Sequence, residues 1–150
     1  MLLREFFSAD AIRLPLRATT RDEVLAEMVG LLATDDKSSD TLLKMLKRRE
    51  SLGSTGVGRG VAVPHCRSLV VNRLRLAYGY SPHGIPFDAT DDLPVHHVFL
   101  IVAPPNEMSN QYLPTLGKIA QLAKEPGVPD LLARLTTPDE FFQLLAEKGF

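Results

Sequence analysis

The chain has 150 residues and a formal net charge of −1 at pH 7, and its 45% hydrophobic and 23% charged residues are ordinary for a soluble globular protein. No apolar run approaches the roughly 18–20 residues that a membrane span needs, and the single cysteine, Cys66, excludes an internal disulfide framework. The N-terminus is too short and too acidic for a secretory signal. We therefore expect one domain over residues 1–150, located in the cytoplasm and without membrane insertion.

The first half of the chain is predicted to place two helices ahead of its first clear strand. In order, the expected elements are an irregular or strand-forming lead-in over 1–18, a helix over about 20–34, a polar loop over 35–40, a helix from Ser39 or Asp40 to just before Gly53, and a short buried strand over Val61–Val63. Thr20 and Glu23 form a capping box that opens the first helix, because the threonine oxygen can accept a hydrogen bond from an unpaired N–H group.

In the second half, strands cluster first and helices follow. The expected elements are strands over Leu69–Val71 and Leu74–Tyr80, a turn over Ser81–Gly84, a short return strand over Ile85–Phe87, a polar loop over 88–94, a strand over Val95–Ala103, and helices over about 110–124, over 128–135 and from Thr137 onward. The run Val95–Ala103 is almost entirely apolar, which is typical of a central strand covered on both faces. In the helix over 110–124, Pro114 must lie in the first turn, and Leu113 is expected to point inward. This order predicts an α/β protein with a small mixed sheet flanked by helices.

A glycine-rich segment joins the second helix to the first buried strand. It holds four glycines within eight residues, at positions 53, 56, 58 and 60. Glycine reaches backbone conformations that are closed to other residues and lets the main chain approach a ligand closely. His65 comes directly after Pro64, which stiffens the exit of the strand, so the histidine is held at a strand end. We interpret His65 as a nucleophile for phosphoryl groups and the glycine segment as its anion cradle.

The residue types around His65 suit phosphoryl transfer. A transferred phosphoryl group spreads negative charge over its oxygens, so catalysis consists mostly of positioning and electrostatic stabilisation. Main-chain amides, hydroxyls and a guanidinium are suitable partners for such a group, and no metal or other cofactor is needed. The predicted phosphate-binding residues are Ser54, Thr55, Gly56, Val57 and Gly58, with Arg49 as the guanidinium.

The distribution of charge supports an anionic ligand or an acidic partner at this place. Between Lys44 and Arg75 there are eight basic residues and one acidic residue, Glu50, which gives +7 and leaves −8 for the rest of the chain. A solvated basic helix face followed by an ordinary turn is the alternative explanation. Nucleic-acid binding is a further alternative, but the overall acidity and the scarcity of aromatic residues in this window argue against it.

Other residues of the same types are weaker candidates. The glycine segment lacks the lysine of a phosphate-binding P-loop and runs from a helix into a strand, which is the reverse of the order that such a loop requires. His96 and His97 are adjacent in a strand and point to opposite faces, so they do not chelate one metal together, although one of them could face the sheet edge near His65. His83 lies in a turn and is expected to be exposed. Cys66 has basic neighbours that could lower its pKa, but no partner group is in evidence, and we treat it as incidental.

These residues resemble the signature of the enzyme IIA domains of the phosphoenolpyruvate-dependent phosphotransferase system, of the fructose/mannitol and nitrogen-regulatory type. The resemblance rests on Arg49-Glu50, on the segment from Gly53 to Gly58, on the run from Gly60 to His65, and on Val98 to Pro104 with the helix after it. It implies an α/β fold with a small mixed sheet, a phosphoryl group accepted by His65 from an HPr-type phosphocarrier protein, and an Arg49 that supports the phosphohistidine. The downstream partner would be a IIB component or a regulatory target protein, and the chain would be a phosphotransferase component, not a stand-alone enzyme.

The sequence departs from the family pattern at three places. The family usually has a second histidine at the start of the helix after the central strand, beside the phosphorylated one, and here that place reads Gln111-Tyr112. Tyrosine can donate a hydrogen bond but holds no charge near neutral pH. Arg59 replaces a residue that is usually small or polar, and Cys66 replaces a glycine. The weakened second site favours nitrogen regulation over sugar transport. A sugar-transport IIA component and an interaction module that is no longer phosphorylated remain the alternatives.

Overall fold

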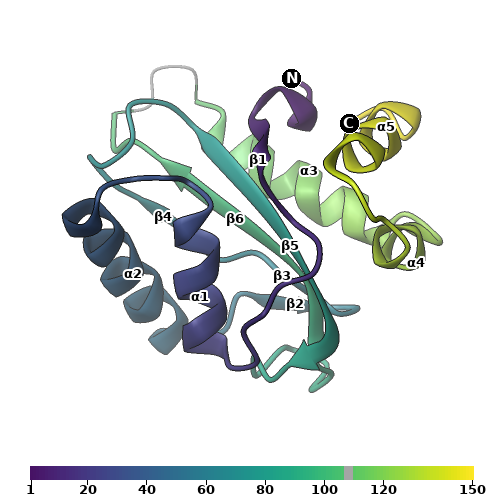
Figure 1. The fold of residues 1–150 in the computed structure, drawn as a ribbon, viewed down its shortest axis with the longest axis horizontal. Coiled ribbons are helices and arrows are strands. Elements are labelled where there is room, and N and C mark those ends of the chain that lie inside the picture. The colour runs from purple at the N-terminus through teal and green to yellow at the C-terminus, as the bar shows by residue number, and fades with distance from the viewer. Residues whose placement is uncertain (107–109) are drawn as a thin grey trace.

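The computed structural model describes residues 1–106 and 110–150, and in these residues the chain forms a mixed six-stranded sheet with helices on both faces (Figure 1). The strands are β1 (Phe7–Arg13), β2 (Gly56–Gly58), β3 (Val61–Ala62), β4 (His65–Arg67), β5 (Arg75–Ile85) and β6 (Val95–Ala103). The helices are the short 3-10 helix η1 (Leu3–Glu5), then α1 (Arg21–Gly30), α2 (Asp36–Ser51), α3 (Tyr112–Lys124), α4 (Val128–Ala133) and α5 (Pro138–Glu147). The predicted α/β class is confirmed.

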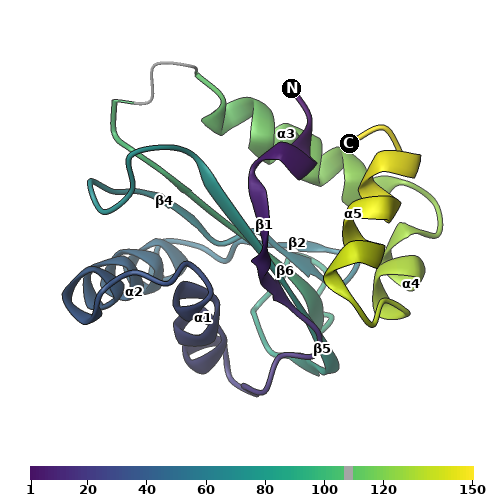
Figure 2. The same cartoon turned by 45° about the horizontal axis from the view of Figure 1, so that its top comes forward.

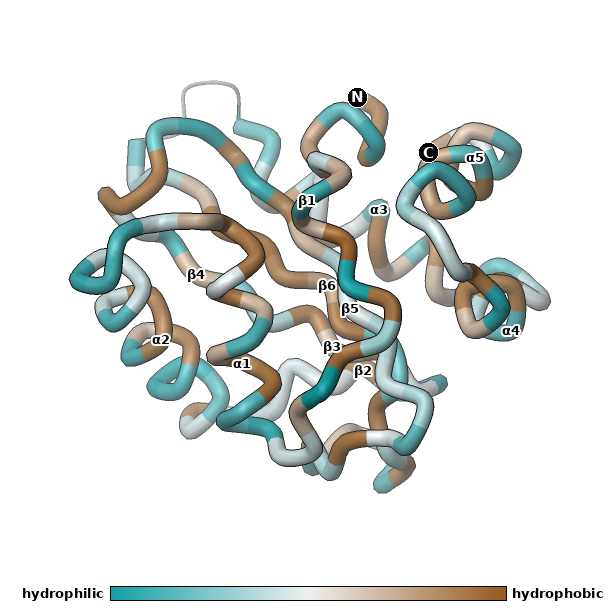
Figure 3. Tube along the Cα trace, viewed as in Figure 1, coloured by the Kyte–Doolittle hydropathy of each residue, from teal (hydrophilic) through white to brown (hydrophobic). Residues whose placement is uncertain are grey.

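The helices divide into two layers that cover opposite faces of the sheet. Helices α1 and α2 lie on one face, and α3, α4 and α5 lie on the other (Figures 1 and 2). Each layer encloses its own cluster of buried apolar side chains, with Leu25 and Leu46 in the first and Ile119 and Phe141 in the second. Hydrophobic residues run along β6 between the two layers (Figure 3). The two chain ends meet, since the Arg4 N–H donates to the Phe150 carbonyl at 3.2 Å.

Strand β6 is the centre of the sheet, as its apolar sequence predicts. It pairs antiparallel with β5 along one side and parallel with β3 and β4 along the other, and the sheet order is β1-β5-β6-β3-β2 with β4 also on β6. Eight of its nine residues are buried and only His96 is partly exposed, so both faces of the strand are covered. Of the elements that carry the site described below, β4 pairs with this strand and α3 packs against it.

Strands β3 and β4 are two halves of one strand that is interrupted at Val63 and Pro64. Val61 pairs with His97 and His65 pairs with Ile101, so the register along β6 is the same before and after the interruption. Pro64 has no N–H to donate, but its carbonyl accepts a hydrogen bond from the Ile101 N–H at 3.0 Å. His65 is therefore the first residue of the second half, β4. The sequence predicts it at the end of the first half instead.

Two predicted element boundaries in the first half need correction. Helix α2 begins at Asp36, so most of the loop predicted over 35–40 is helical. Asp35 is its N-cap, and the Asp35 carboxylate accepts from the Ser38 N–H at 2.8 Å, a capping signal that the polar composition of the segment concealed. Helix α1 is capped by Thr20 as predicted but ends at Gly30, four residues early.

Three expectations in the second half are also wrong. Leu69–Val71 is a turn, not a strand, and the Val71 N–H donates to the Ser68 carbonyl. Ser81–Gly84 is part of β5, and the return strand predicted over Ile85–Phe87 does not form. The turn residues there produce a register shift within one long strand, because Tyr80 pairs with His97 and Ile85 pairs with Val95. His83 is exposed, as predicted.

The helices of the second half agree more closely with the prediction. Pro114 lies in the first turn of α3, and Thr137 and Glu140 form the predicted capping box of α5. Leu113 was predicted to point inward, but its side chain is 70% exposed. The buried face of α3 is the one that carries Tyr112. Leu113 is the next residue, so its side chain is turned by about 100° around the helix axis, away from the sheet.

A buried polar pair lies between the sheet and α4. The Tyr78 hydroxyl is 2.8 Å from Nδ1 of His97, and the two rings are stacked. Burial, together with the nearby His96, lowers the pKa of His97 from its ordinary value of 6.5 to about 4, and Asp130 opposes that shift. His97 is therefore neutral in the folded protein at neutral pH, and it pairs with Val61, four positions along β6 from the partner of His65. The structure thus places His97 away from His65.

We predict that His97 makes the protein less stable in mild acid. Between pH 7 and 5 the unfolded chain takes up a proton at this residue and the folded chain does not, so the free energy of unfolding should fall by about 2 kcal/mol from this residue alone. Urea unfolding at both pH values measures the difference. The fall should shrink by that amount in His97→Asn and persist in His83→Asn, whose parent side chain is exposed. An equal fall in both variants would contradict the assignment.

Candidate functional site

His65 is held by a hydrogen bond to the strand interruption beside it. Its side chain is half-buried, and Nδ1 lies 2.7 Å from the Val63 carbonyl oxygen. A carbonyl oxygen only accepts, so Nδ1 must carry the proton in this contact. In the neutral ring the lone pair is then on Nε2, which fixes both the tautomer and the atom that is able to attack an electrophile.

Nε2 of His65 is open to solvent. Within the described residues it has no hydrogen-bond partner, and the one buried side-chain polar atom without a partner there is Oγ1 of Thr115. A half-buried ring whose unpartnered nitrogen is not enclosed must present that nitrogen to water. The arrangement is that of a nucleophile with an oriented ring and a free lone pair.

Arg67 and Tyr112 lie beside His65 on the α3 face of the sheet. Residues two apart in a strand point to the same face, so β4 turns His65 and Arg67 the same way. The Tyr112 ring meets the His65 ring edge-on, with 6.1 Å between centroids, and the Arg67 guanidinium lies 4.2 Å above the centroid of the Tyr112 ring. Gln111 is the N-cap residue of α3 and Tyr112 its first residue, so the start of this helix is at the site. Tyr112 therefore does reach the imidazole.

The Tyr112 hydroxyl is neutral at any physiological pH. Burial, followed by the nearby Cys66, raises its pKa to about 12, while the positive charges of Arg67 and Arg49 act in the opposite direction. Arg49 extends from the last turn of α2, and its Nη1 donates to the Gly53 carbonyl at 2.7 Å. Arg67 thus lies beside Tyr112 and His65, although the sequence had singled out Arg49, whose place at His65 stays a prediction.

Cys66 points the other way, into the core under α1 and α2. It is buried, and this burial raises the pKa of its thiol to about 12, so the lowering that its basic neighbours could have produced does not occur. Successive side chains of a strand point to opposite faces, so Cys66 faces away from His65 and Arg67. The interpretation of Cys66 as incidental to the chemistry agrees with this placement.

The hydroxyls predicted as phosphate ligands make internal hydrogen bonds. The Thr55 N–H and hydroxyl donate to the two carboxylate oxygens of Glu50 at 3.0 and 2.6 Å. The Ser54 hydroxyl donates to the Phe87 carbonyl and accepts from the Gly56 N–H at 2.9 Å. In this structure these groups hold the segment in shape. Glu50, buried at the end of α2, is a positioning residue, a role that its place in the family signature did not reveal.

The glycine segment is a hairpin edge of the sheet, not a free loop. Gly56, Val57 and Gly58 form β2, which pairs antiparallel with β3. A side chain at Gly56 would come within 2.7 Å of the Ala89 Cβ, so a close approach of two backbones requires this glycine. The Thr55 carbonyl accepts from the Val63 N–H at 3.0 Å, so the start of β2 lies near His65. Gly58 pairs with Val61, so it lies further from His65 than the start of β2 does. The phosphate-binding role of these residues stays a prediction.

The described residues contain no group of three or more potential metal ligands, and no described helix is long and apolar enough to cross a membrane. His96 and His97 point to opposite faces, with Nδ1 of His96 2.8 Å from the Ser81 carbonyl oxygen, so the argument against joint chelation holds for this geometry.

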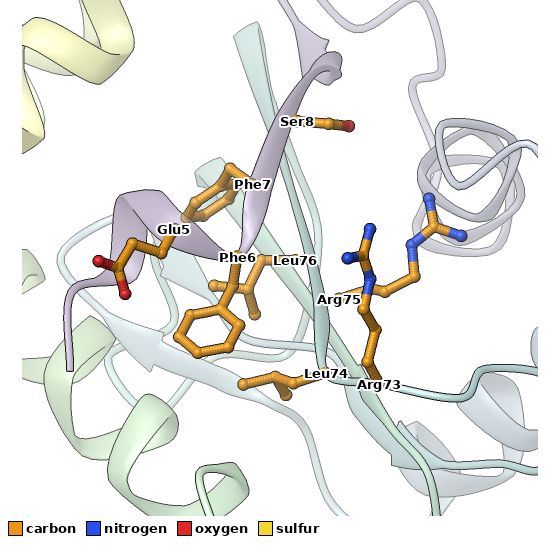
Figure 4. Close-up of a pocket in the computed structure, with 8 residues that line it drawn as sticks. All are labelled: Glu5, Phe6, Phe7, Ser8, Arg73, Leu74, Arg75 and Leu76. Atoms are coloured by element: carbon orange, nitrogen blue, oxygen red, sulfur yellow. The ribbon is translucent and has the colours of Figure 1, made fainter.

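A second basic region lies across β6 from β4. Arg75 pairs with Val102, whose other neighbour in the sheet is Cys66. Arg73 and Arg75 point to the same side of β5, at a cavity of about 190 Å³ that is also lined by Phe6, Phe7 and Ser8 (Figure 4). Burial and the charge of Arg73 lower the pKa of Arg75. These arginines belong to the same basic stretch of sequence as His65 but lie two strands away from it.

These features define a class of protein: a small α/β fold that presents a histidine with one bare ring nitrogen beside an arginine. The chain belongs to the enzyme IIA family, since the family model described as "Phosphoenolpyruvate-dependent sugar phosphotransferase system, EIIA 2" matches residues 5–148. The family predicted from the residues around His65 is confirmed.

Curated relatives come from both branches of this family. The chain is 32% identical over 143 residues to the 2-O-alpha-mannosyl-D-glycerate-specific EIIABC component of Escherichia coli, covering 93% of the chain and 22% of that protein. It is 27% identical to the fructose-specific EIIABC component of Bacillus subtilis, covering 97% of the chain and 23% of that protein. It is 29% identical to the nitrogen regulatory protein of Pseudomonas aeruginosa, covering 85% of the chain and 84% of that protein. The chain thus spans less than a quarter of the length of the two sugar-specific relatives.

Solved structures agree with the fold. The nitrogen regulatory protein IIA-Ntr of Neisseria meningitidis superimposes with a TM-score of 0.86 at 27% identity, covering 95% of this chain and 98% of that one. The mannitol enzyme IIA of Escherichia coli has the same fold, with a TM-score of 0.74 at 23% identity and coverage of 92% and 97%.

We predict that Glu50 fixes the shape of the segment before β2. Replacing Glu50 by Ala leaves the Thr55 N–H and hydroxyl without their acceptor, so the free energy of unfolding should fall by about 2–3 kcal/mol. The Thr55 amide should also exchange with solvent faster in hydrogen-exchange NMR. Glu5→Ala, which removes an exposed carboxylate of η1, serves as the control. Unchanged Thr55 exchange in Glu50→Ala would show that the contact does not order the segment.

Proposed function

We propose that this protein is a phosphoryl carrier of the phosphotransferase system in which His65 accepts the phosphoryl group. The observation that carries the proposal is the hydrogen bond from Nδ1 of His65 to the Val63 carbonyl, because it leaves the lone pair on a solvent-facing Nε2. Family membership supports the same assignment. A cytoplasmic location and a donor protein of the HPr type are part of this proposal.

The reaction needs no group beyond those of the site and the donor. The Nε2 lone pair attacks the phosphorus of the phosphorylated donor, the Nε2–P bond forms, and the bond from phosphorus to the donor breaks with its electron pair leaving on the donor. Phosphorylation leaves the ring positively charged. The Nδ1–H then donates more strongly to the Val63 carbonyl, so the same hydrogen bond that orients the nucleophile stabilises the product.

The electrostatic surroundings favour a bound phosphoryl group. Arg49 approaches from the end of α2, and the first turn of α3 brings the positive end of a helix dipole to the same place. The neutral Tyr112 hydroxyl adds no negative charge. Glu50, the acid closest in sequence to the site, is buried and bonded to Thr55, so it does not neutralise these cations at the surface.

Exposed leucines next to the site supply a docking surface for the partner proteins. Leu52 caps α2 beside Arg49, Leu69 follows β4, and Leu113 follows Tyr112, with 78%, 86% and 70% of each side chain exposed. Exposed apolar side chains around a reactive group are typical of an interaction site. A solved complex of the mannitol enzyme IIA with phosphorylated enzyme IIB of Escherichia coli supports a IIB component as one class of acceptor.

Within the family we propose nitrogen regulation over sugar transport. Nitrogen regulatory proteins of Pseudomonas aeruginosa and Bradyrhizobium diazoefficiens match this chain over 84% and 95% of their own length. The place where the family usually has a second histidine holds Tyr112, which does not share a proton or a charge with His65 near neutral pH. A site of this kind suits a regulatory mark that is held for longer better than it suits rapid throughput to a permease.

We predict that incubation with phosphoenolpyruvate, enzyme I and HPr adds one acid-labile phosphate to the protein. The label should be absent in His65→Ala and unchanged in His83→Ala, because His83 is exposed and lies on a different strand. Intact-mass measurement before and after acid treatment gives the stoichiometry. Equal labelling of the two variants would refute the assignment of His65. No labelling of the parent protein by any donor would favour the interaction module.

We further predict that Leu113→Asp slows phosphorylation by HPr about tenfold, since a charge is placed in the docking surface at a cost of about 1.4 kcal/mol. Phosphorylation by the small donor phosphoramidate should not change, because that donor needs no docking surface. Leu93→Asp is the matched control, as Leu93 is 56% exposed in the loop before β6. Slowing with both donors would show that Leu113 acts on the chemistry instead.

A further inference from the structure

Arg67 is an exposed cation with few contacts, and it is directed toward the site. Its guanidinium lies over the Tyr112 ring at 4.2 Å from the centroid, and its Nη1 donates to the Pro104 carbonyl at 3.4 Å, the far limit of a hydrogen bond. Within the described residues that is its one hydrogen bond, and the two ion pairs there, Arg13–Glu27 and Arg21–Asp88, do not involve it. Most of its donors are therefore available.

The position of Arg67 in the strand brings these donors to the face of the sheet that carries His65. Both side chains leave β4 on the α3 side, two residues apart, and Tyr112 lies against both of them. A guanidinium stacked on an aromatic ring keeps its N–H groups in its own plane, directed away from the ring. Those N–H groups match the geometry of phosphate oxygens, for which arginine is the preferred side chain.

We propose that Arg67 is a phosphate-binding residue of this site, held over the Tyr112 ring in the unmodified protein and moving onto the phosphoryl oxygens when His65 is phosphorylated. The inference rests on the proposed function of His65 and adds a residue to it. Tyr112 is the platform that keeps the guanidinium near the histidine before the phosphoryl group arrives. Arg49, whose Nη1 donates to the Gly53 carbonyl, is the other arginine proposed for the site.

The energetic argument favours this movement. A cation–π contact at an exposed site is weaker than a charge-assisted hydrogen bond to a phosphate oxygen. The guanidinium therefore exchanges a weaker contact for a stronger one when a dianionic group appears beside it. Because arginine stays protonated at all relevant pH values, this stabilisation does not depend on the titration of a second site residue.

The test compares phosphorylation of His65 by phosphoramidate in the parent protein, Arg67→Ala and Arg67→Lys. Arg67→Ala should react roughly tenfold more slowly, which is the effect of one lost charge-assisted hydrogen bond. Arg67→Lys should recover part of the rate, because it restores the charge without the planar pair of donors. Arg73→Ala is the matched control, since it removes an exposed arginine of the same basic stretch that lies at the start of β5, and its rate should equal that of the parent.

A second measurement uses the unmutated protein, so it does not depend on how the variants fold. NMR of the arginine side-chain N–H groups should show the Arg67 signals shifting on phosphorylation, together with the ring signals of Tyr112 as the guanidinium leaves it. A parent protein that is phosphorylated with Arg67 signals unmoved and with an unchanged rate in Arg67→Ala would overturn this inference alone. A parent protein that phosphoramidate and phosphorylated HPr both leave unlabelled would overturn the proposed function and this inference together.

Discussion

The contact on which the site depends is the hydrogen bond between Nδ1 of His65 and the Val63 carbonyl. The Val63 N–H donates to the Thr55 carbonyl, so the polar backbone groups of Val63 face away from β6, and its carbonyl is available to the imidazole. Pairing with β6 continues past Val63, because the Pro64 carbonyl accepts from the Ile101 N–H and His65 pairs with Ile101. The register of the strand is thus kept, and the ring is positioned by the sheet and not by a loop.

The glycine segment serves this site mainly by its shape. Gly56 lets β2 approach the backbone at Ala89, and Glu50 fixes Thr55 to the end of α2 through two hydrogen bonds. Because Arg49 is the residue before Glu50, the same contact sets where the Arg49 guanidinium emerges. A buried carboxylate with two good donors is strongly directional, so the loss of either partner disturbs the end of the helix and the edge of the sheet together.

The fold could be predicted because its main signals are local. The apolar run Val95–Ala103 identified the central strand, and Thr137 with Glu140 identified the start of α5. The errors arose where tertiary pairing outweighs local signals: Ser81–Gly84 reads as a turn but is held in β5 by the neighbouring β6. In the site, composition and spacing predict His65 and Arg49, and their roles stay predictions. The internal hydrogen bonds of Ser54 and Thr55 were not, because they depend on partners brought near by the fold.

Arg67 could have been singled out by one argument that the sequence does allow. Alternation along a strand places residues two apart on the same face, so any cation at that spacing from His65 shares its surface. What the sequence could not supply is the aromatic ring that holds the guanidinium there, since Tyr112 comes from a helix 45 positions later in the chain. A tyrosine with a pKa near 12 and an arginine form a pair whose charge is constant over the physiological range, whereas a histidine in the same place would titrate within it. Under the proposed function, the charge that faces the phosphoryl group is then set by the fold and not by the pH of the cell, which suits the regulatory role that we propose.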